Sequence, residues 1–116
     1  VSGMALAMGV ESAVEIFESY PGCRNDAGMT DLLRRAAGKI LGKENVLELP
    51  EPSMGTDDFG YFSDLVPGCY YYIGVGNESR GFTYPNHNPR FAADMEALPL
   101  AAAVEIQAAV DFLCDL

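Results

Sequence analysis

The feature that most restricts the fold of this chain is the run C-Y-Y-Y-I-G-V over residues 69–75. It is rich in aromatic and β-branched side chains and does not alternate with charged ones. Such a run is typical of a strand buried on both faces, as in a parallel sheet covered by helices. We therefore expect a layered α/β fold in which other elements cover both sides of this strand.

The clearest helix is expected between residues 26 and 42. Asn25 or Asp26 can accept hydrogen bonds from its first turn, and Gly42 stands where the backbone leaves the helix. Its apolar face recurs at spacings of three and four residues. The face consists of Met29, Leu32, Leu33, Ala36 and Ile40.

Helical and extended patterns alternate along the rest of the chain. In chain order we expect a helix over 2–10, strands over 13–18 and 46–49, a helix that Thr56 caps and that runs through Leu65, and a helix over 94–116 with Pro99 in its first turn or at a kink. This order predicts mainly parallel pairing. Two or three strands are fewer than the usual ~5–6, so such a sheet needs more chain or a partner.

Charge and cysteine content exclude several classes of function. The formal net charge is −10, and five of the seven basic residues fall within residues 24–43, so the overall field repels phosphate and nucleic acid is not an expected partner. No apolar run approaches the ~20 residues of a membrane span. Cys23, Cys69 and Cys114 are widely spaced and form no C-x-x-C pair, which favours reduced thiols in a cytoplasmic protein.

His87 is the single histidine and lies in a long loop over residues 76–93. Pro85 and Pro89 flank it and stiffen the backbone that presents the imidazole. A lone loop histidine is more often a surface or packing residue than a ligand, but a loop beyond a buried strand is where α/β folds build their sites. A zinc site needs three or four ligands, and no second ligand stands at a telling spacing, so this chain cannot complete one.

A second candidate is the segment M-G-T-D-D-F over residues 54–59. One interpretation is structural, because Asp57 and Asp58 in the first turn of a helix interact favourably with its dipole. The other is functional, because Gly55 permits a close backbone approach that suits the lining of a pocket. The residues alone leave both interpretations open.

Six short motifs stand in one order along the chain. They are Y-P with N-D at 20–26, M-G-T-D-D-F at 54–59, V-P-G at 66–68, Y-I-G at 72–74, H-N-P-R-F at 87–91 and A-L-P at 97–99. Together they resemble the C-terminal block of the zinc-dependent aminoacylase, hippurate-hydrolase and carboxypeptidase family of amidohydrolases, which are metallopeptidases. The resemblance covers essentially the whole chain.

The resemblance implies a partial α/β sandwich, formed by the C-terminal segment of a catalytic domain over residues 21–116. Residues 1–20 would be the last helix and strand of a ferredoxin-like lid or dimerisation domain. His87 corresponds to the last metal ligand of the family, whereas the other ligands and the glutamate general base lie upstream, so no catalytic residue is assigned here. Asp57, Asp58 and Asn86 are implied substrate-binding or outer-shell residues, although the family usually has Glu where this chain has Asp57.

The implied function is that of a C-terminal fragment of an enzyme that cleaves the amide bond of N-acyl amino acids or small peptides. The complete enzyme would use zinc, or manganese or cobalt, while this chain would bind no metal tightly and be inactive alone. An upstream polypeptide or a second copy of the chain is the expected partner. The alternatives are a non-catalytic binding or assembly module with the same fold, and an acyl-transfer enzyme based on Cys69, which has no histidine nearby in sequence.

Overall fold

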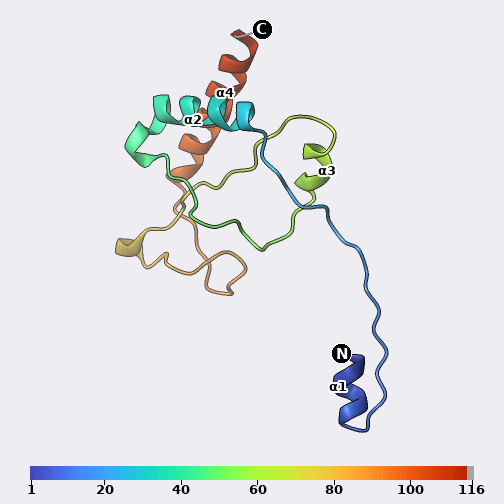
Figure 1. The fold of residues 1–116 in the computed structure, drawn as a ribbon. Helices are drawn as coiled ribbons and strands as arrows, with labels where there is room; N and C mark the ends of the chain where they lie inside the picture. The colour runs from blue at the N-terminus through green and yellow to red at the C-terminus, as the bar shows by residue number, and fades with distance from the viewer. Residues whose placement is uncertain (115–116) are drawn as a thin grey trace.

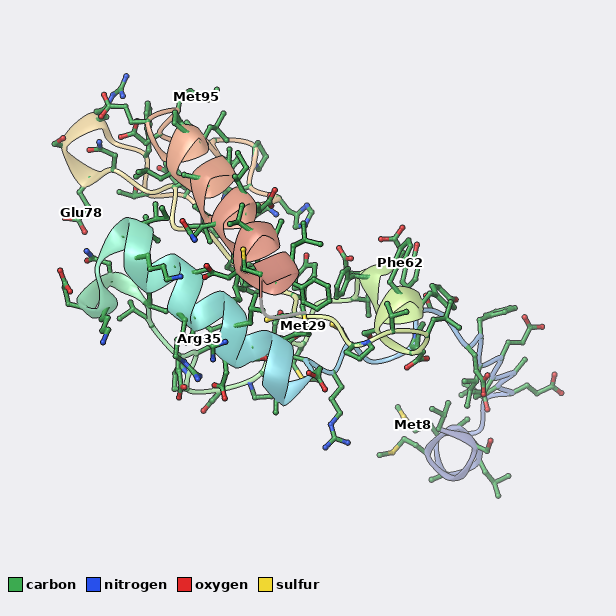
Figure 2. The ribbon with its side chains drawn as sticks, turned by 90° about the horizontal axis from the view of Figure 1, so that it is seen from above. Met8, Met29, Arg35, Phe62, Glu78 and Met95 are labelled. Atoms are coloured by element: carbon green, nitrogen blue, oxygen red, sulfur yellow. The ribbon has the colours of Figure 1, made fainter. Side chains whose placement is uncertain are left out.

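The computed structural model of the protein describes residues 1–114 and shows a mainly helical chain (Figure 1). Two helices, α2 and α4, lie side by side in both views (Figures 1 and 2). The elements in chain order are α1 (Ser2–Ala7), α2 (Ala27–Leu41), the 3₁₀ turn η1 (Lys43–Asn45), α3 (Phe59–Ser63), the 3₁₀ turn η2 (Glu78–Arg80) and α4 (Ala97–Cys114).

Helix α2 begins and ends as the sequence predicts. Asp26 is the N-cap, and its Oδ1 accepts a hydrogen bond from the Met29 N–H at 2.9 Å. The chain leaves the helix at Gly42, whose φ of 87° is open to glycine but disfavoured for other residues. The predicted helix is therefore confirmed, with Asp26 as its cap.

Asn25 has a different role from capping. Its amide Nδ2 donates to the Tyr70 carbonyl and its Oδ1 accepts from the Tyr70 N–H, both at 2.8 Å. The Asp26 N–H also donates to the Gly68 carbonyl at 2.9 Å. These three bonds fasten the start of α2 to residues 68–70, where the expected strand 69–75 begins.

The small apolar core lies between α2 and α4. Ala36 and Val104 are fully buried, and Leu32 and Ala37 are buried beside them. At the edge of this contact the Lys39 ammonium pairs with the Asp111 carboxylate at 2.6 Å. Helix α4 confirms the final predicted helix, with Pro99 in its first turn, where a proline costs no intrahelical hydrogen bond. Residues 115–116 lie outside the described part of the chain.

Helix α3 is shorter than expected, and Thr56 does not cap it. The helix runs only from Phe59 to Ser63. The physical reason is local: the Asp57 side chain accepts the Phe59 N–H at 2.9 Å, which makes a turn two residues before the helix. The predicted cap at Thr56 and the predicted end at Leu65 are therefore wrong.

The expected strands lack partners within residues 1–114. The segments 13–18, 46–49 and 69–75 join no ladder, and the one bridge in the described chain pairs Asn77 with Phe82. Over 71–75 burial alternates, with Tyr71 and Ile73 half-buried but Tyr72 61% exposed, whereas Cys69 and Tyr70 are both half-buried. This run therefore has one covered face instead of the two expected, and an α/β sandwich would need strands and helices from elsewhere.

The chain is extended for its length. Its radius of gyration is 19.9 Å, whereas a compact domain of about 100 residues has about 13 Å. Helix α1 lies far from the α2–α4 pair in both views (Figures 1 and 2). The segment between them exposes large apolar side chains, including Ile16 at 88% and Phe17 at 81%. These surfaces are the kind that a further layer of protein covers.

Helix α4 is also unusually apolar. Its 18 residues have a mean hydropathy of 1.6, and by length and composition alone the helix could cross a membrane. The helix thus approaches the length of a span, contrary to the expectation from the sequence, and core helices of soluble proteins pass the same test. The expectation of a protein without a membrane partner stays a prediction.

Candidate metal-ligand loop

The loop that carries His87 is closed at its base by Asp94. The Asp94 N–H donates to the Val75 carbonyl at 2.8 Å, and the Asp94 carboxylate accepts from the Asn77 amide at 2.5 Å and from the Arg80 guanidinium at 3.0 Å. The hydrogen bond from Asn77, with others from the Glu96 N–H and Arg80, holds the pKa of Asp94 below its usual range. The two ends of the loop are thereby fixed to each other.

A tight hairpin follows the first end of the loop. The backbone of Asn77 exchanges two hydrogen bonds with Phe82, at 3.0 and 2.9 Å, around the turn η2. Gly81 closes this turn with a φ of 74°. The Arg80 guanidinium lies 5.1 Å from the centre of the Phe82 ring. The hairpin therefore places Arg80 where it can also bind Asp94.

His87 lies in a second turn with an unusual backbone. Its φ is 66°, and it is the one non-glycine residue with positive φ in the described chain. Histidine enters this left-handed region more readily than most residues, but still at a cost. The Asn88 N–H donates to the Pro85 carbonyl at 3.2 Å, and the Asn88 side chain accepts from the Arg90 N–H at 2.9 Å. Asn88 is thus a turn former.

Tyr84 and Arg90 close this second turn from outside. The Arg90 guanidinium donates to the Tyr84 hydroxyl at 2.8 Å and lies 5.4 Å from the centre of the same ring. The two residues stand three positions before and after His87. Arg90 belongs to the H-N-P-R-F motif, but the sequence predicted no role for it, and none for Tyr84.

The imidazole of His87 is exposed, and within residues 1–114 it has no hydrogen-bond partner. The interaction at this residue is through its backbone N–H, which donates to the Asn86 Oδ1 at 3.0 Å. A neutral imidazole with a free ring nitrogen is a good ligand for zinc, manganese or cobalt. The donor chemistry of His87 therefore fits a metal, and Asn86 acts on the backbone of that donor.

The acidic candidates lie in another part of the chain. Asp57 accepts a hydrogen bond from the Tyr70 hydroxyl at 3.2 Å, and this bond and the charge of Asp57 raise the pKa of Tyr70. Asp58 stands at the start of α3 and its side chain caps no N–H there. Helix α3 lies apart from the loop that follows η2 (Figure 1). The structure therefore does not bring Asp57 or Asp58 together with His87.

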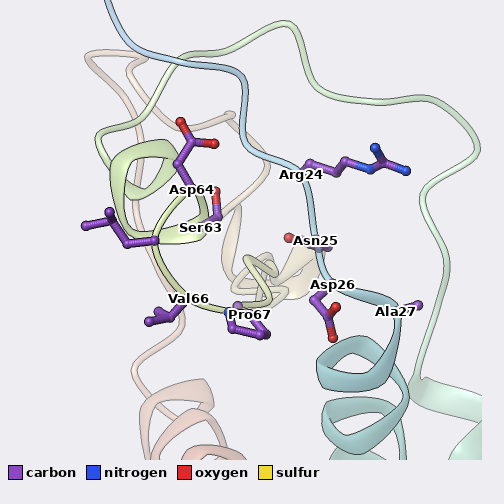
Figure 3. Close-up of a pocket in the computed structure, with 10 residues that line it drawn as sticks. Arg24, Asn25, Asp26, Ala27, Ser63, Asp64, Val66 and Pro67 are labelled. Carbon is purple, nitrogen blue, oxygen red and sulfur yellow. The ribbon is translucent and has the colours of Figure 1, made fainter.

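The described residues also form no alternative group of metal ligands. Among the described residues 1–114, no three side chains of His, Cys, Asp or Glu gather closely enough to hold a metal ion. One cleft lies between the start of α2 and the chain that leaves α3 (Figure 3). It is lined by residues 24–27 and 63–68, so it contains none of the four predicted site residues.

Comparison with known proteins places these observations in a family. The model of peptidase family M20/M25/M40 matches residues 7–111. IAA-amino acid hydrolase ILR1-like 6 of Arabidopsis thaliana is 32% identical over 111 residues, which are 92% of this chain and 24% of that protein. Thermostable carboxypeptidase 1 of Saccharolobus solfataricus is 34% identical over 113 residues, 97% of this chain and 28% of that protein.

A third relative is named for a different kind of compound. N-acetyldiaminopimelate deacetylase of Streptococcus suis is 36% identical over 100 residues, 85% of this chain and 25% of that protein. The chain thus spans about a quarter of the length of the curated relatives it matches. No solved structure matches it. Because the family model covers nearly the whole sequence, the chain belongs to peptidase family M20/M25/M40, as the ordered motifs around His87 indicate.

Proposed function

We propose that this chain is part of a metal-dependent hydrolase that cleaves the amide bond of N-acyl amino acids or small peptides, and that His87 is one of its metal ligands. The observation that carries the proposal is the exposed imidazole of His87, presented by a braced turn within a chain that matches the M20/M25/M40 family over residues 7–111. The names of the relatives, a hydrolase of amino-acid conjugates, a carboxypeptidase and a deacetylase, support amide-bond cleavage.

The remaining ligands come, in this proposal, from polypeptide outside these 116 residues. Two observations support this. A zinc site takes three or four protein ligands, and the described residues contain no group of three or more His, Cys, Asp or Glu side chains that could hold a metal ion. The extended shape and the exposed Ile16 and Phe17 also leave surfaces for additional protein to cover. The chain by itself would therefore be inactive.

Within the complete site, the part of His87 is to hold the metal through a neutral ring nitrogen. A divalent metal bound there would lower the pKa of a bound water molecule and would polarise the carbonyl of the substrate amide. Asn86 contributes by accepting the backbone N–H of His87, which restrains the turn beneath the ligand. Residues 21–116 would form the closing part of the catalytic domain, as a segment of an α/β sandwich, and residues 1–20 the end of a lid domain.

The first test is an assay of the chain by itself. Hydrolysis of N-acyl amino acids is measured with zinc, manganese or cobalt added, and metal binding is followed by calorimetry. We expect no turnover and only weak binding, because one imidazole cannot assemble a hydrolytic centre. Robust metal-dependent turnover by these 116 residues would show that the site is complete within the chain.

The second test supplies the missing ligands. These 116 residues replace the matching segment of thermostable carboxypeptidase 1, to which they are 34% identical. We expect the chimera to bind metal and to hydrolyse the substrate of the carboxypeptidase. The chimera with His87→Ala should lose both metal binding and turnover. Arg34→Ala, which removes an exposed cation on α2 that pairs with Asp31 and Glu48, is the matched control. A His87→Ala chimera with full metal content would exclude His87 as a ligand.

A further inference from the structure

We propose that Tyr84 and Arg90 are positioning residues that form a clasp across the turn of residues 84–90 and hold His87 in its left-handed conformation. The role of the presented imidazole rests on the function proposed above. The clasp itself is a statement about the backbone of this chain. It concerns Tyr84, which lies outside the six motifs, and Arg90, which lies within H-N-P-R-F but was given no role there.

Two separate contacts join the same pair of side chains. The Arg90 guanidinium donates to the Tyr84 hydroxyl at 2.8 Å, and it also lies over the Tyr84 ring at 5.4 Å from its centre. A guanidinium can stack on an aromatic ring and keep its planar set of donors free for a hydrogen bond. The pair therefore resists both separation and sliding.

Two backbone hydrogen bonds close the turns beneath the clasp, from the Asn88 N–H to the Pro85 carbonyl at 3.2 Å and from the Phe91 N–H to the Asn88 carbonyl at 2.9 Å. Pro85 and Pro89 have no N–H to donate. Each proline also pushes the residue before it, Tyr84 and Asn88, toward extended conformations. The turn residues lie on both sides of Asn88, at 86–87 and 89–90, and His87 has the positive φ. The link between Tyr84 and Arg90 joins the residues on either side of the first of these two backbone bonds, so it adds a side-chain closure to the backbone closure.

The surroundings of Arg90 support its role in the clasp with Tyr84. Arg80, the other arginine of the loop, pairs with the Asp94 carboxylate at the loop base. Within residues 1–114, the Arg90 guanidinium has no carboxylate partner, and its hydrogen bond and its ring contact are both with Tyr84. Arg90 therefore acts at the apex of the loop, whereas Arg80 and Asp94 act at its base.

Nuclear magnetic resonance of the 116-residue chain tests the clasp without any metal. A residue with positive φ has a short distance between its own amide and α protons and so gives a strong intraresidue Overhauser effect. We expect this strong signal at His87 in the wild type and a several-fold weaker one in Arg90→Ala. Tyr84→Phe keeps the ring but loses the hydroxyl, and Arg90→Lys keeps the charge but loses the planar fork, so both should give intermediate signals.

Arg34→Ala is the control, because it removes an exposed arginine from α2 and should leave the His87 signal unchanged. Helix content, measured by circular dichroism, shows whether each variant is folded, and if Arg90→Ala loses helix the Tyr84→Phe variant decides. A weak signal in the wild type, or an unchanged strong signal in the folded clasp variants, would overturn the proposal. This experiment uses no metal, so a failed clasp is distinguishable from a failure of the proposed function. In that second failure, the His87→Ala chimera would keep its metal and its turnover.

Discussion

Asn77 and Asp94 stand at opposite ends of the loop that carries His87, and the Asn77 amide donates a hydrogen bond to the Asp94 carboxylate. The Arg80 guanidinium donates to the other oxygen of the same carboxylate. One ionised side chain thus fixes both ends of a loop that is otherwise irregular. His87, the candidate ligand, lies toward the far end of the loop, and the Asp94 carboxylate that fixes the loop lies at its base.

Asp94→Asn is expected to lower the free energy of unfolding at neutral pH and to make it depend less on pH in acid. The pKa of Asp94 is lowered in the folded chain, so its carboxylate contributes stability above the unfolded pKa of about 3.9 and loses it as the pH falls through the lower folded pKa. Denaturant unfolding at pH 7 and at pH 3 measures the difference. Glu96→Gln, two residues away, is the control, and an equal effect of both changes would contradict this reading.

Lys39→Met is expected to raise the pKa of Asp111 toward its ordinary value. Hydrogen bonds from Lys39 and Gln107 hold that pKa low, and the Lys39 bond is the larger cause. Titration of the Asp111 carboxyl carbon by nuclear magnetic resonance measures the shift. Gln107→Ala should produce a smaller rise. An Asp111 pKa that does not move in Lys39→Met would mean that α2 and α4 are not joined by this pair in solution.

The sequence was most informative where a local rule determines local structure. The helix α2 could be predicted with its bounds because its apolar spacing, the Asp26 cap and the exit at Gly42 all agree. Pro99 likewise indicated the first turn of α4. Thr56 misled, because Asp57 offers a competing acceptor one residue later, and a sequence does not reveal which of two neighbouring caps the backbone uses.

Strands and the candidate site depend on what lies across from them. The run 69–75 has the composition of a strand, but a strand exists only with a partner, and none lies within residues 1–114. For the same reason His87 could be proposed as a ligand while its companions could not. The positive φ of His87 and the clasp by Tyr84 and Arg90 arise from closure of the turn, which no periodic pattern encodes.

Val104→Ala is expected to destabilise the chain by about 2 kcal/mol, because Val104 is fully buried on the helix that packs against α2 and its truncation leaves a cavity. Ile106→Ala on the same helix is the control, since Ile106 is 64% exposed and should change stability by less than about 0.5 kcal/mol. Denaturant unfolding measures both. If the two variants were equally destabilised, the α2–α4 contact would be differently oriented or covered by a further layer.

Asn25→Ala is expected to cost about 1 kcal/mol, through loss of its two hydrogen bonds to the Tyr70 backbone. Hydrogen exchange should show faster exchange at the Tyr70 amide. Asp26→Ala should have a similar total cost, since it removes the α2 cap, but its faster exchange should appear at Met29. The same exchange pattern in both variants would show that Asn25 and Asp26 act as one structural unit and not as a brace and a cap.

His87→Gly and His87→Ala both remove the imidazole, and they should differ in stability because of the backbone. At a φ of 66° an alanine keeps the clash of its Cβ, whereas glycine has none. Glycine also gains freedom in the unfolded chain, which offsets part of this advantage. The net expectation is that the glycine variant is more stable than the alanine variant by roughly 1 kcal/mol in denaturant unfolding. If alanine proved the more stable, the left-handed turn would be absent in solution, and the presentation of His87 by this loop would have no backbone basis.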